Sequence, residues 1–169
     1  MAYSRVYLLN DIKEFYTKTH LQPILGLDIG EKTIGIAIAD ANWRMAVPLL
    51  TLTRQKFTKD ADRLIQLIQT RNIAGLVIGY PLMLDGSAQN RAQSCKSFAQ
   101  NLCRLETWHW PIILYDERFS TVSANRILID KLDNSRKKRA KLVDQIAACV
   151  ILQNALDRLN HLVDKNERV

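Results

Sequence analysis

The segment ILGLDIGEKTIGIAIAD, residues 24–40, decides the fold. Its first part, residues 24–29, is a short apolar run, and residues 33–40 alternate isoleucine with glycine or alanine. An alternation with period two is typical of a β-strand. The connection at residues 30–32 is short and contains a glycine, so the two runs are expected to form an antiparallel hairpin.

Strands and helices alternate after this hairpin. The expected elements are a strand at 47–53 with Pro48 at a strand start or sheet edge, a helix at 58–71, a strand at 74–79, a helix at 87–105, a strand at 111–115, a helix from Ser120 and, after a polar basic loop, a long helix at 141–162. Strands that are separated by helices return in parallel through right-handed crossovers. The sequence therefore predicts an α/β fold with a mixed five-stranded sheet, in which a three-strand antiparallel meander is joined by two parallel strands and flanked by helices.

Length and composition are those of one globular domain. The chain has 169 residues, of which 47% are hydrophobic and 24% charged. We expect a domain at 23–162, an N-terminal appendage at 1–22 with a helix at 9–17, and a C-terminal tail at 163–169. No apolar stretch is long enough to span a membrane, and the run at 6–9 is too short for a signal peptide. These features predict a cytoplasmic protein.

The three cysteines are expected to be reduced packing residues. Cys95, Cys103 and Cys149 lie far apart, are odd in number and fall in apolar helical patterns. A disulfide scaffold is therefore excluded.

Positive charge is concentrated in one run. The formal net charge is +7, and five of the cations lie within six residues, namely Arg136, Lys137, Lys138, Arg139 and Lys141. Such a run fits contact with a polyanion, although a charge run can also be only a solvated loop.

Carboxylates stand at two strand ends. Asp28 interrupts an apolar strand, where it either caps the turn through Gly30 or ligates a metal. Asp116 and Glu117 follow a strand at the edge where open α/β sheets bind ligands, unless they are an exposed pair offset by Arg118. Because side chains alternate along a strand, only one of this pair can point the way Asp28 points, and the sequence leaves open which.

Another carboxylate is out of pattern in the last helix. Asp144 shares a helix face with Ala147, Ala148 and Ile151. Small residues on that face would let the helix approach the sheet closely, although placement near the helix start would also explain an acid there. If these carboxylates converge, a shared divalent cation would relieve their repulsion, and hard oxygen ligands suit Mg²⁺ or Mn²⁺. Two such ions support phosphodiester hydrolysis.

Four motifs together resemble the YqgF family, also called RuvX, over residues 24–160. They are LDIGEKTIGIAIAD, VIGYPLMLDGSAQNRA, DERFST and VDQIAACVILQNAL. The resemblance implies a fold like that of RNase H and a metal-dependent endonuclease that acts in 5′-end maturation of pre-16S ribosomal RNA. Its implied catalytic and metal-binding residues are Asp28, Asp116, Glu117 and Asp144, with two Mg²⁺ or Mn²⁺ ions.

Substrate contacts are expected beside these carboxylates. The expected nucleic-acid-binding residues are Lys32, Arg91, Arg118, Arg136, Lys137, Lys138, Arg139 and Lys141, and Asp85 and Ser87 would line the site unless Asp85 only forms a turn. Thr33 stands where the family pattern usually has Arg or Lys, which predicts a weaker phosphate or carboxylate contact beside Asp28.

The sequence leaves partners and substrate open. The expected partners are structured RNA or branched DNA and ribosomal precursor particles, without a membrane, for a monomer or a homodimer. A DNA nuclease that resembles Holliday junction resolvases is one alternative, and a ribosome-assembly factor that binds nucleic acid without cleaving it is another.

Overall fold

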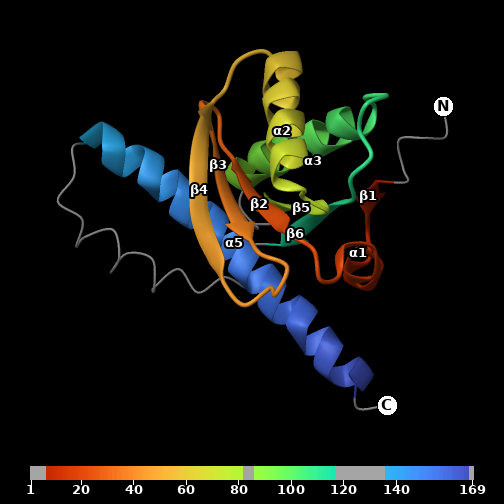
Figure 1. Cartoon of the computed structure of the whole chain (residues 1–169). Coiled ribbons are helices and arrows are strands. Elements are labelled where there is room, and N and C mark those ends of the chain that lie inside the picture. The colour runs from red at the N-terminus through yellow and green to blue at the C-terminus, as the bar shows by residue number, and fades with distance from the viewer. Residues whose placement is uncertain (1–6, 82–85, 117–135, 168–169) are drawn as a thin grey trace.

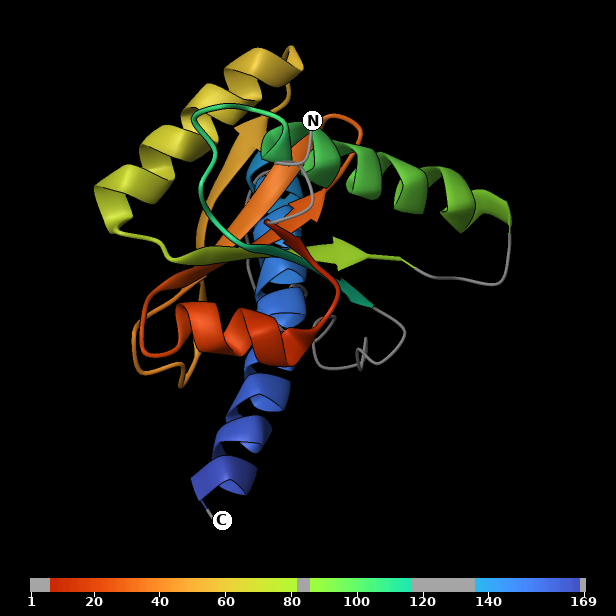
Figure 2. The ribbon, with the colours of Figure 1, turned by 90° about the vertical axis from the view of Figure 1, so that its right-hand side faces the viewer.

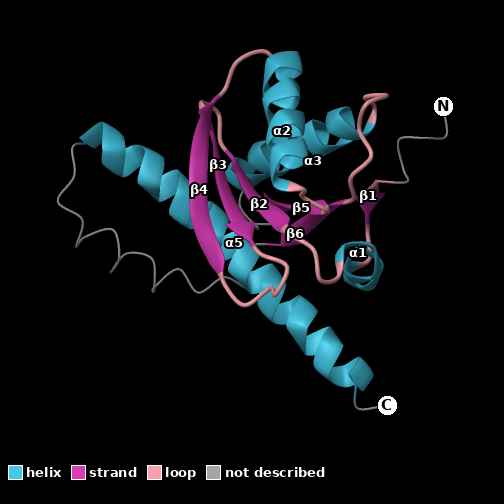
Figure 3. Ribbon diagram, viewed as in Figure 1, coloured by secondary structure: helices cyan, strands magenta, loops and turns pink. Residues whose placement is uncertain are grey.

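The computed structural model describes residues 7–81, 86–116 and 136–167. Along the chain the elements are β1 (Leu8–Leu9), α1 (Ile12–Thr19), β2 (Ile24–Ile29), β3 (Thr33–Ala39), β4 (Ala46–Thr53), α2 (Phe57–Arg71), β5 (Gly75–Tyr80), α3 (Gly86–Cys103), β6 (Ile112–Asp116) and α5 (Arg136–Glu167). The helix expected from Ser120 lies outside the described residues. Figure 3 shows how helices and strands alternate in space.

The strands form one mixed sheet in the order β1-β6-β5-β2-β3-β4. β2, β3 and β4 pair antiparallel, which confirms the meander, and β2, β5 and β6 pair parallel, which confirms the crossovers. β4 lies at the edge of the sheet, where Pro48 is tolerated because no further strand needs its missing N–H.

The sheet has six strands, so the predicted number of five was wrong. The added strand is β1, which pairs parallel with β6 through Leu8 and Leu9. Two residues are too short to display an alternating pattern, and their neighbours in the sheet are more than 100 positions away in sequence. The helix expected at 9–17 is α1 and begins later, at Ile12, because the side chain of Asp11 caps the backbone N–H of Lys13.

Helices cover both faces of the sheet (Figure 1). α2 and α3 lie on one face, over a core that includes Leu25, Leu27 and Ile36. α5 crosses the other face, and α1 lies beside it near the base of the sheet (Figure 2). Alternate residues of the same strands, such as Ile24 and Ala37, face α5.

α5 lies unusually close to the sheet because two strand residues under it are glycines. A Cβ built at Gly35 would lie 2.0 Å from the backbone oxygen of Asp144, and one built at Gly26 would lie 2.5 Å from the Cβ of Leu152. No side chain fits at either position unless the helix moves. The predicted close approach of this helix is therefore confirmed, and it requires the glycines of the hairpin.

The basic run is helical, so the predicted loop before residue 141 was wrong for residues 136–140. α5 begins at Arg136, and Asp144 is its ninth residue. Exposed arginine and lysine carry no apolar periodicity, yet both are good helix formers. Because Asp144 lies two turns inside the helix, the helix dipole does not explain its position.

In the part of the chain that the structure describes, no helix is both long and apolar enough to cross a membrane.

Candidate active site

Asp28 and Asp144 meet where α5 crosses the hairpin. Asp28 lies on β2 directly opposite Gly35 of β3, so both residues face the same side of the sheet. The backbone of Asp144 lies against Gly35 on that side. The hairpin and the helix therefore bring together two carboxylates that are 116 positions apart in the sequence.

Arg91 of α3 pairs with the first of these carboxylates. Its Nη2 donates to Oδ1 of Asp28 at 2.8 Å, and the Asp28 side chain is only 13% exposed. Burial raises the pKa of Asp28 above 3.8, and the negative charge of Asp144 raises it further, while Arg91 opposes both. The ion pair explains why a carboxylate is tolerated here, and the pKa shift shows that the pair does not fully offset its burial.

The second carboxylate is held by a neutral donor. The hydroxyl Oγ1 of Thr33 donates to Oδ2 of Asp144 at 2.7 Å. In the sequence, Thr33 stands out only as a departure from a basic family pattern. Its bond to Asp144 joins residues 111 positions apart, which no local pattern could reveal.

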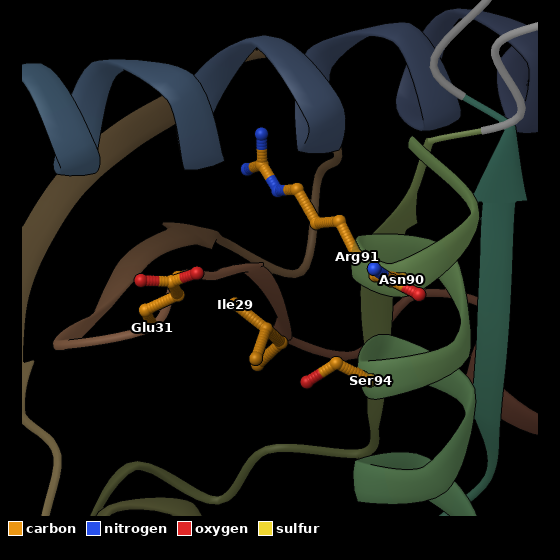
Figure 4. A pocket seen from close by; sticks show the side chains of 6 residues that line it. Ile29, Glu31, Asn90, Arg91 and Ser94 are labelled. Atoms are coloured by element: carbon orange, nitrogen blue, oxygen red, sulfur yellow. The ribbon is translucent and has the colours of Figure 1, made fainter. Parts of the chain in front are cut away.

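A cleft adjoins these carboxylates. It has a volume of about 680 Å³ and is lined by Ile29, Gly30, Glu31, Asn90, Arg91 and Ser94. Figure 4 shows Arg91 reaching from α3 toward α5 while Glu31 and Ser94 border the space below it. Glu31, Asn90 and Ser94 were not among the residues predicted from the sequence. Ser94 lies one helical turn after Arg91, so spacing on α3 could have indicated it.

The turn that borders this cleft is held by Arg54, the residue that follows β4. Arg54 donates from Nη1 to the carbonyl oxygen of Gly30 at 2.8 Å, and its Nε lies 4.0 Å from Oδ2 of Asp60. Asp60 is fully buried and accepts hydrogen bonds from the backbone N–H of Gln55. This ion pair connects the start of α2 to the turn that follows Asp28.

The structure does not bring Asp116 together with the other two carboxylates. Tyr115 packs in the core under α5, so Asp116, the next residue of β6, faces the opposite side of the sheet. Among the described residues, no three histidine, cysteine, aspartate or glutamate side chains gather as a metal site. Glu117 and Arg118 lie outside the described residues.

The other predicted residues that the structure describes lie in three places: the first turns of α5, the hairpin turn and the start of α3. Arg136, Lys138, Arg139 and Lys141 are exposed on the first turns of α5, and Lys137 belongs to the same turns. Lys32 is exposed in the hairpin turn, and Ser87 lies at the start of α3. Asp85 lies outside the described residues. The basic end of α5 extends past β4 (Figure 1).

The cysteines are packing residues, as predicted. Cys95 and Cys103 are buried, Cys149 is half-buried and none of the three forms a disulfide. Burial raises the pKa of Cys103 and of Cys149 to about 11, so both thiols are protonated near neutral pH.

Comparison with known proteins identifies the family. The model of the RuvX family, described as Holliday junction resolvase, matches residues 22–158. The chain belongs to the RuvX family. This family is one of nucleases, which hydrolyse phosphodiester bonds, and the resemblance found in the sequence motifs is confirmed.

Two similar proteins and one solved structure illustrate the relationship. A protein of Phenylobacterium zucineum named "Putative pre-16S rRNA nuclease" is 48% identical over 140 residues, which cover 83% of this chain and 89% of that protein. A protein of Paracoccus denitrificans with the same name is 50% identical over 139 residues, covering 82% and 86%. T. thermophilus RuvC in complex with a Holliday junction substrate has a TM-score of 0.53 at 11% identity, covering 82% of this chain and 96% of that one. This likeness confirms the RNase H-like fold.

Proposed function

We propose that this RuvX-family protein is a divalent-metal-dependent endonuclease that acts on precursors of 16S ribosomal RNA in the cytoplasm. The observation that carries the proposal is the meeting of Asp28 and Asp144 on one side of the sheet, beside the cleft that Arg91 lines. The substrate class follows the names of the similar proteins. Contact with ribosomal precursor particles belongs to the same proposal.

The residues at this place fit Mg²⁺ or Mn²⁺. Asp144 is close enough to raise the pKa of Asp28, and two adjacent carboxylates are costly unless a cation shares them. Carboxylate oxygens are the ligands that these hard cations prefer. When bound, such ions supply a water of lowered pKa and stabilise the negative charge on the leaving oxygen.

The side chains of the cleft would handle the substrate. Arg91 is half exposed, so its guanidinium can exchange the Asp28 carboxylate for a phosphate of the substrate. In that exchange Asp28 becomes available to a cation. The exposed cations at the start of α5 would hold the flanking phosphates.

We propose Glu117 as the third metal-binding carboxylate and assign Asp116 no metal. The alternation of side chains along β6 supports this choice, because Asp116, the last residue of the strand, faces the side of the sheet opposite to Asp28. Glu117→Gln should therefore abolish cleavage, whereas Asp116→Asn should retain it. The opposite result would assign the role to Asp116.

Cleavage assays of purified variants test the function. Wild type should cleave a precursor RNA that carries the 16S 5′ leader only when Mg²⁺ or Mn²⁺ is present. Asp28→Asn and Asp144→Asn should lose activity by at least about 10²-fold, because each removes one cation ligand. Asp157→Asn is the matched control, because Asp157 is exposed on the same helix and lies away from the cleft. This variant should keep the wild-type activity.

The same assays should include a four-way DNA junction and an unstructured RNA. The family description favours the junction as a second candidate substrate. Faster cleavage of the junction than of the leader RNA would replace the proposed substrate with DNA. Binding of RNA with no cleavage under any metal would instead make the protein a non-catalytic assembly factor.

A further inference from the structure

Thr33 connects the two elements that carry the candidate carboxylates. It is the first residue of β3, and its carbonyl oxygen accepts from the backbone N–H of Gly30 at 2.9 Å, which closes the turn after Asp28. Its hydroxyl donates to Oδ2 of Asp144 at 2.7 Å. The half-buried side chain of Thr33 therefore connects the end of the hairpin to the Asp144 side chain of α5.

This bond differs from the other hydrogen bonds that seat α5. Thr51 of β4 donates its hydroxyl to the backbone oxygen of Lys141 and accepts from Nε2 of Gln145. Those bonds hold the position of the helix but leave the direction of a carboxylate undetermined. Only the Thr33 hydroxyl, among the bonds described for Asp144, acts on the carboxylate itself.

The chemistry of the donor matters as well as its position. Asp28 is paired with a cation, which competes with a divalent metal for the same carboxylate. The Thr33 hydroxyl fixes one oxygen of Asp144 and leaves its full negative charge available. The Thr33 side chain is β-branched, so its χ1 is restricted and the direction of its hydroxyl is well defined.

We propose that Thr33 is a positioning residue that orients the carboxylate of Asp144 toward a divalent cation shared with Asp28. The proposal rests on the metal-dependent function above. It gives a role at the site to the threonine that stands where the family pattern usually has a basic residue. A basic side chain at position 33 would neutralise Asp144, whereas the threonine hydroxyl only orients its carboxylate.

The test measures metal affinity directly. Mn²⁺ binding to wild type, Thr33→Val, Thr33→Ser and Thr51→Val is followed by titration calorimetry and by the Mn²⁺-dependent rise of the melting temperature. Loss of a hydrogen bond behind a metal ligand weakens binding by about 10-fold to 100-fold, so Thr33→Val should show that loss. Thr33→Ser keeps the hydroxyl and should stay within about threefold of wild type.

Thr51→Val is the matched control. It replaces a threonine that also bonds α5 from the sheet, so it should lower the melting temperature without metal and leave the Mn²⁺ affinity unchanged. Binding of nucleic acid in EDTA should be the same for Thr33→Val and wild type. If Thr33→Val binds Mn²⁺ as wild type does, or if Thr51→Val loses as much affinity as Thr33→Val, the proposal is wrong.

The outcome for wild type separates this proposal from the function on which it rests. A wild-type protein that binds no Mn²⁺ overturns both. Wild-type binding with an unaffected Thr33→Val variant overturns only the role of Thr33.

Discussion

At the scale of single residues, Asp28 lies between opposing charges. Arg91 donates to it from α3, and the negative charge of Asp144 acts on it from α5. Burial raises the pKa of Asp28 most strongly. Arg91 lowers this pKa, and the charge of Asp144 raises it. The folded protein therefore keeps a proton on Asp28 to a higher pH than the unfolded chain does.

This pKa shift predicts how Asp28 affects stability as pH changes. Between pH 3.8 and the raised pKa, the folded state binds more protons than the unfolded state, so the contribution of Asp28 to the free energy of unfolding falls as pH rises. Urea unfolding of wild type and Asp28→Asn in EDTA measures this contribution. The free energy of unfolding of wild type minus that of Asp28→Asn should fall as pH rises through this window and then level off.

Arg91→Gln provides the control for that experiment. Removing the cation removes the influence that lowers the pKa, so the fall should extend to higher pH in the Arg91→Gln background. A difference between wild type and Asp28→Asn that grows with rising pH would contradict the assignment.

The sequence indicated Asp28 and Asp144 but not which residues pair with them, and the reason is physical. Asp28 and Asp144 were visible because a charge in an apolar strand or on a small-residue helix face breaks a local pattern. The donors that hold them, Arg91 and Thr33, are exposed or polar residues in unremarkable local positions. Their partners are 63 and 111 positions away, so only the folded chain reveals the pairing.

At the scale of elements, the contact between α5 and the hairpin positions the site. Gly35 lies under Asp144 with no room for a Cβ. Gly35→Ala should therefore lower the free energy of unfolding by about 1–3 kcal/mol, because the helix must lift or the strand must shift. The same shift should displace Asp144, so the variant should also need more Mn²⁺ for half-maximal thermal stabilisation.

Ile36→Val gives a matched loss of stability on the other face of the same strand. Ile36 is fully buried on the side of α2 and α3, and removing one methylene should cost about 0.5–1.5 kcal/mol. Its Mn²⁺ dependence should equal that of wild type. If both variants, or neither, change the Mn²⁺ requirement, the helix–hairpin contact does not position Asp144.

Most element boundaries could be predicted because periodicity marks buried faces. The strand expected at 47–53 is Ala46–Thr53, and the helix expected at 58–71 is Phe57–Arg71. The start of α5 was missed because its first residues are exposed cations without a buried face. β1 was missed because it pairs with β6, a strand that is distant in the sequence, and no local pattern reveals that pairing.

At the scale of the whole molecule, the basic run and Asp144 lie on one continuous helix, α5. α5 has 32 residues, so it is about 48 Å long, and the Arg136 end lies about 12 Å along its axis from Asp144. A phosphate backbone held at the basic end would thus lie near the carboxylates without any loop to place it.

Salt dependence of nucleic-acid binding tests this arrangement. Each phosphate contact contributes about −0.9 to the slope of log K against log salt on duplex DNA and about −0.7 on single strands. Replacing Arg136, Lys137, Lys138 and Arg139 by Gln, which preserves helix propensity, should flatten the slope by about one to three units. The rate at saturating substrate should change less than the affinity.

A control with the same change in net charge removes exposed cations from the opposite layer. Its four substitutions to Gln are at Lys56, Lys59, Arg71 and Arg104. This control should keep the wild-type slope. An unchanged slope in the α5 variant would mean that the run is only solvated and that the substrate enters elsewhere, beside Arg91 and Lys32.

The two outer strands of the sheet also bear on how the protein behaves at high concentration. One edge ends in β1, which is only two residues long, and the other in β4, which carries Pro48 and a register shift in its pairing with β3. The N–H of Ala46 on β4 is already taken by the side chain of Gln153 at 2.9 Å. Short, proline-bearing and irregular edges resist pairing with strands of other molecules. The folded sheet is therefore protected against edge-to-edge aggregation at high concentration.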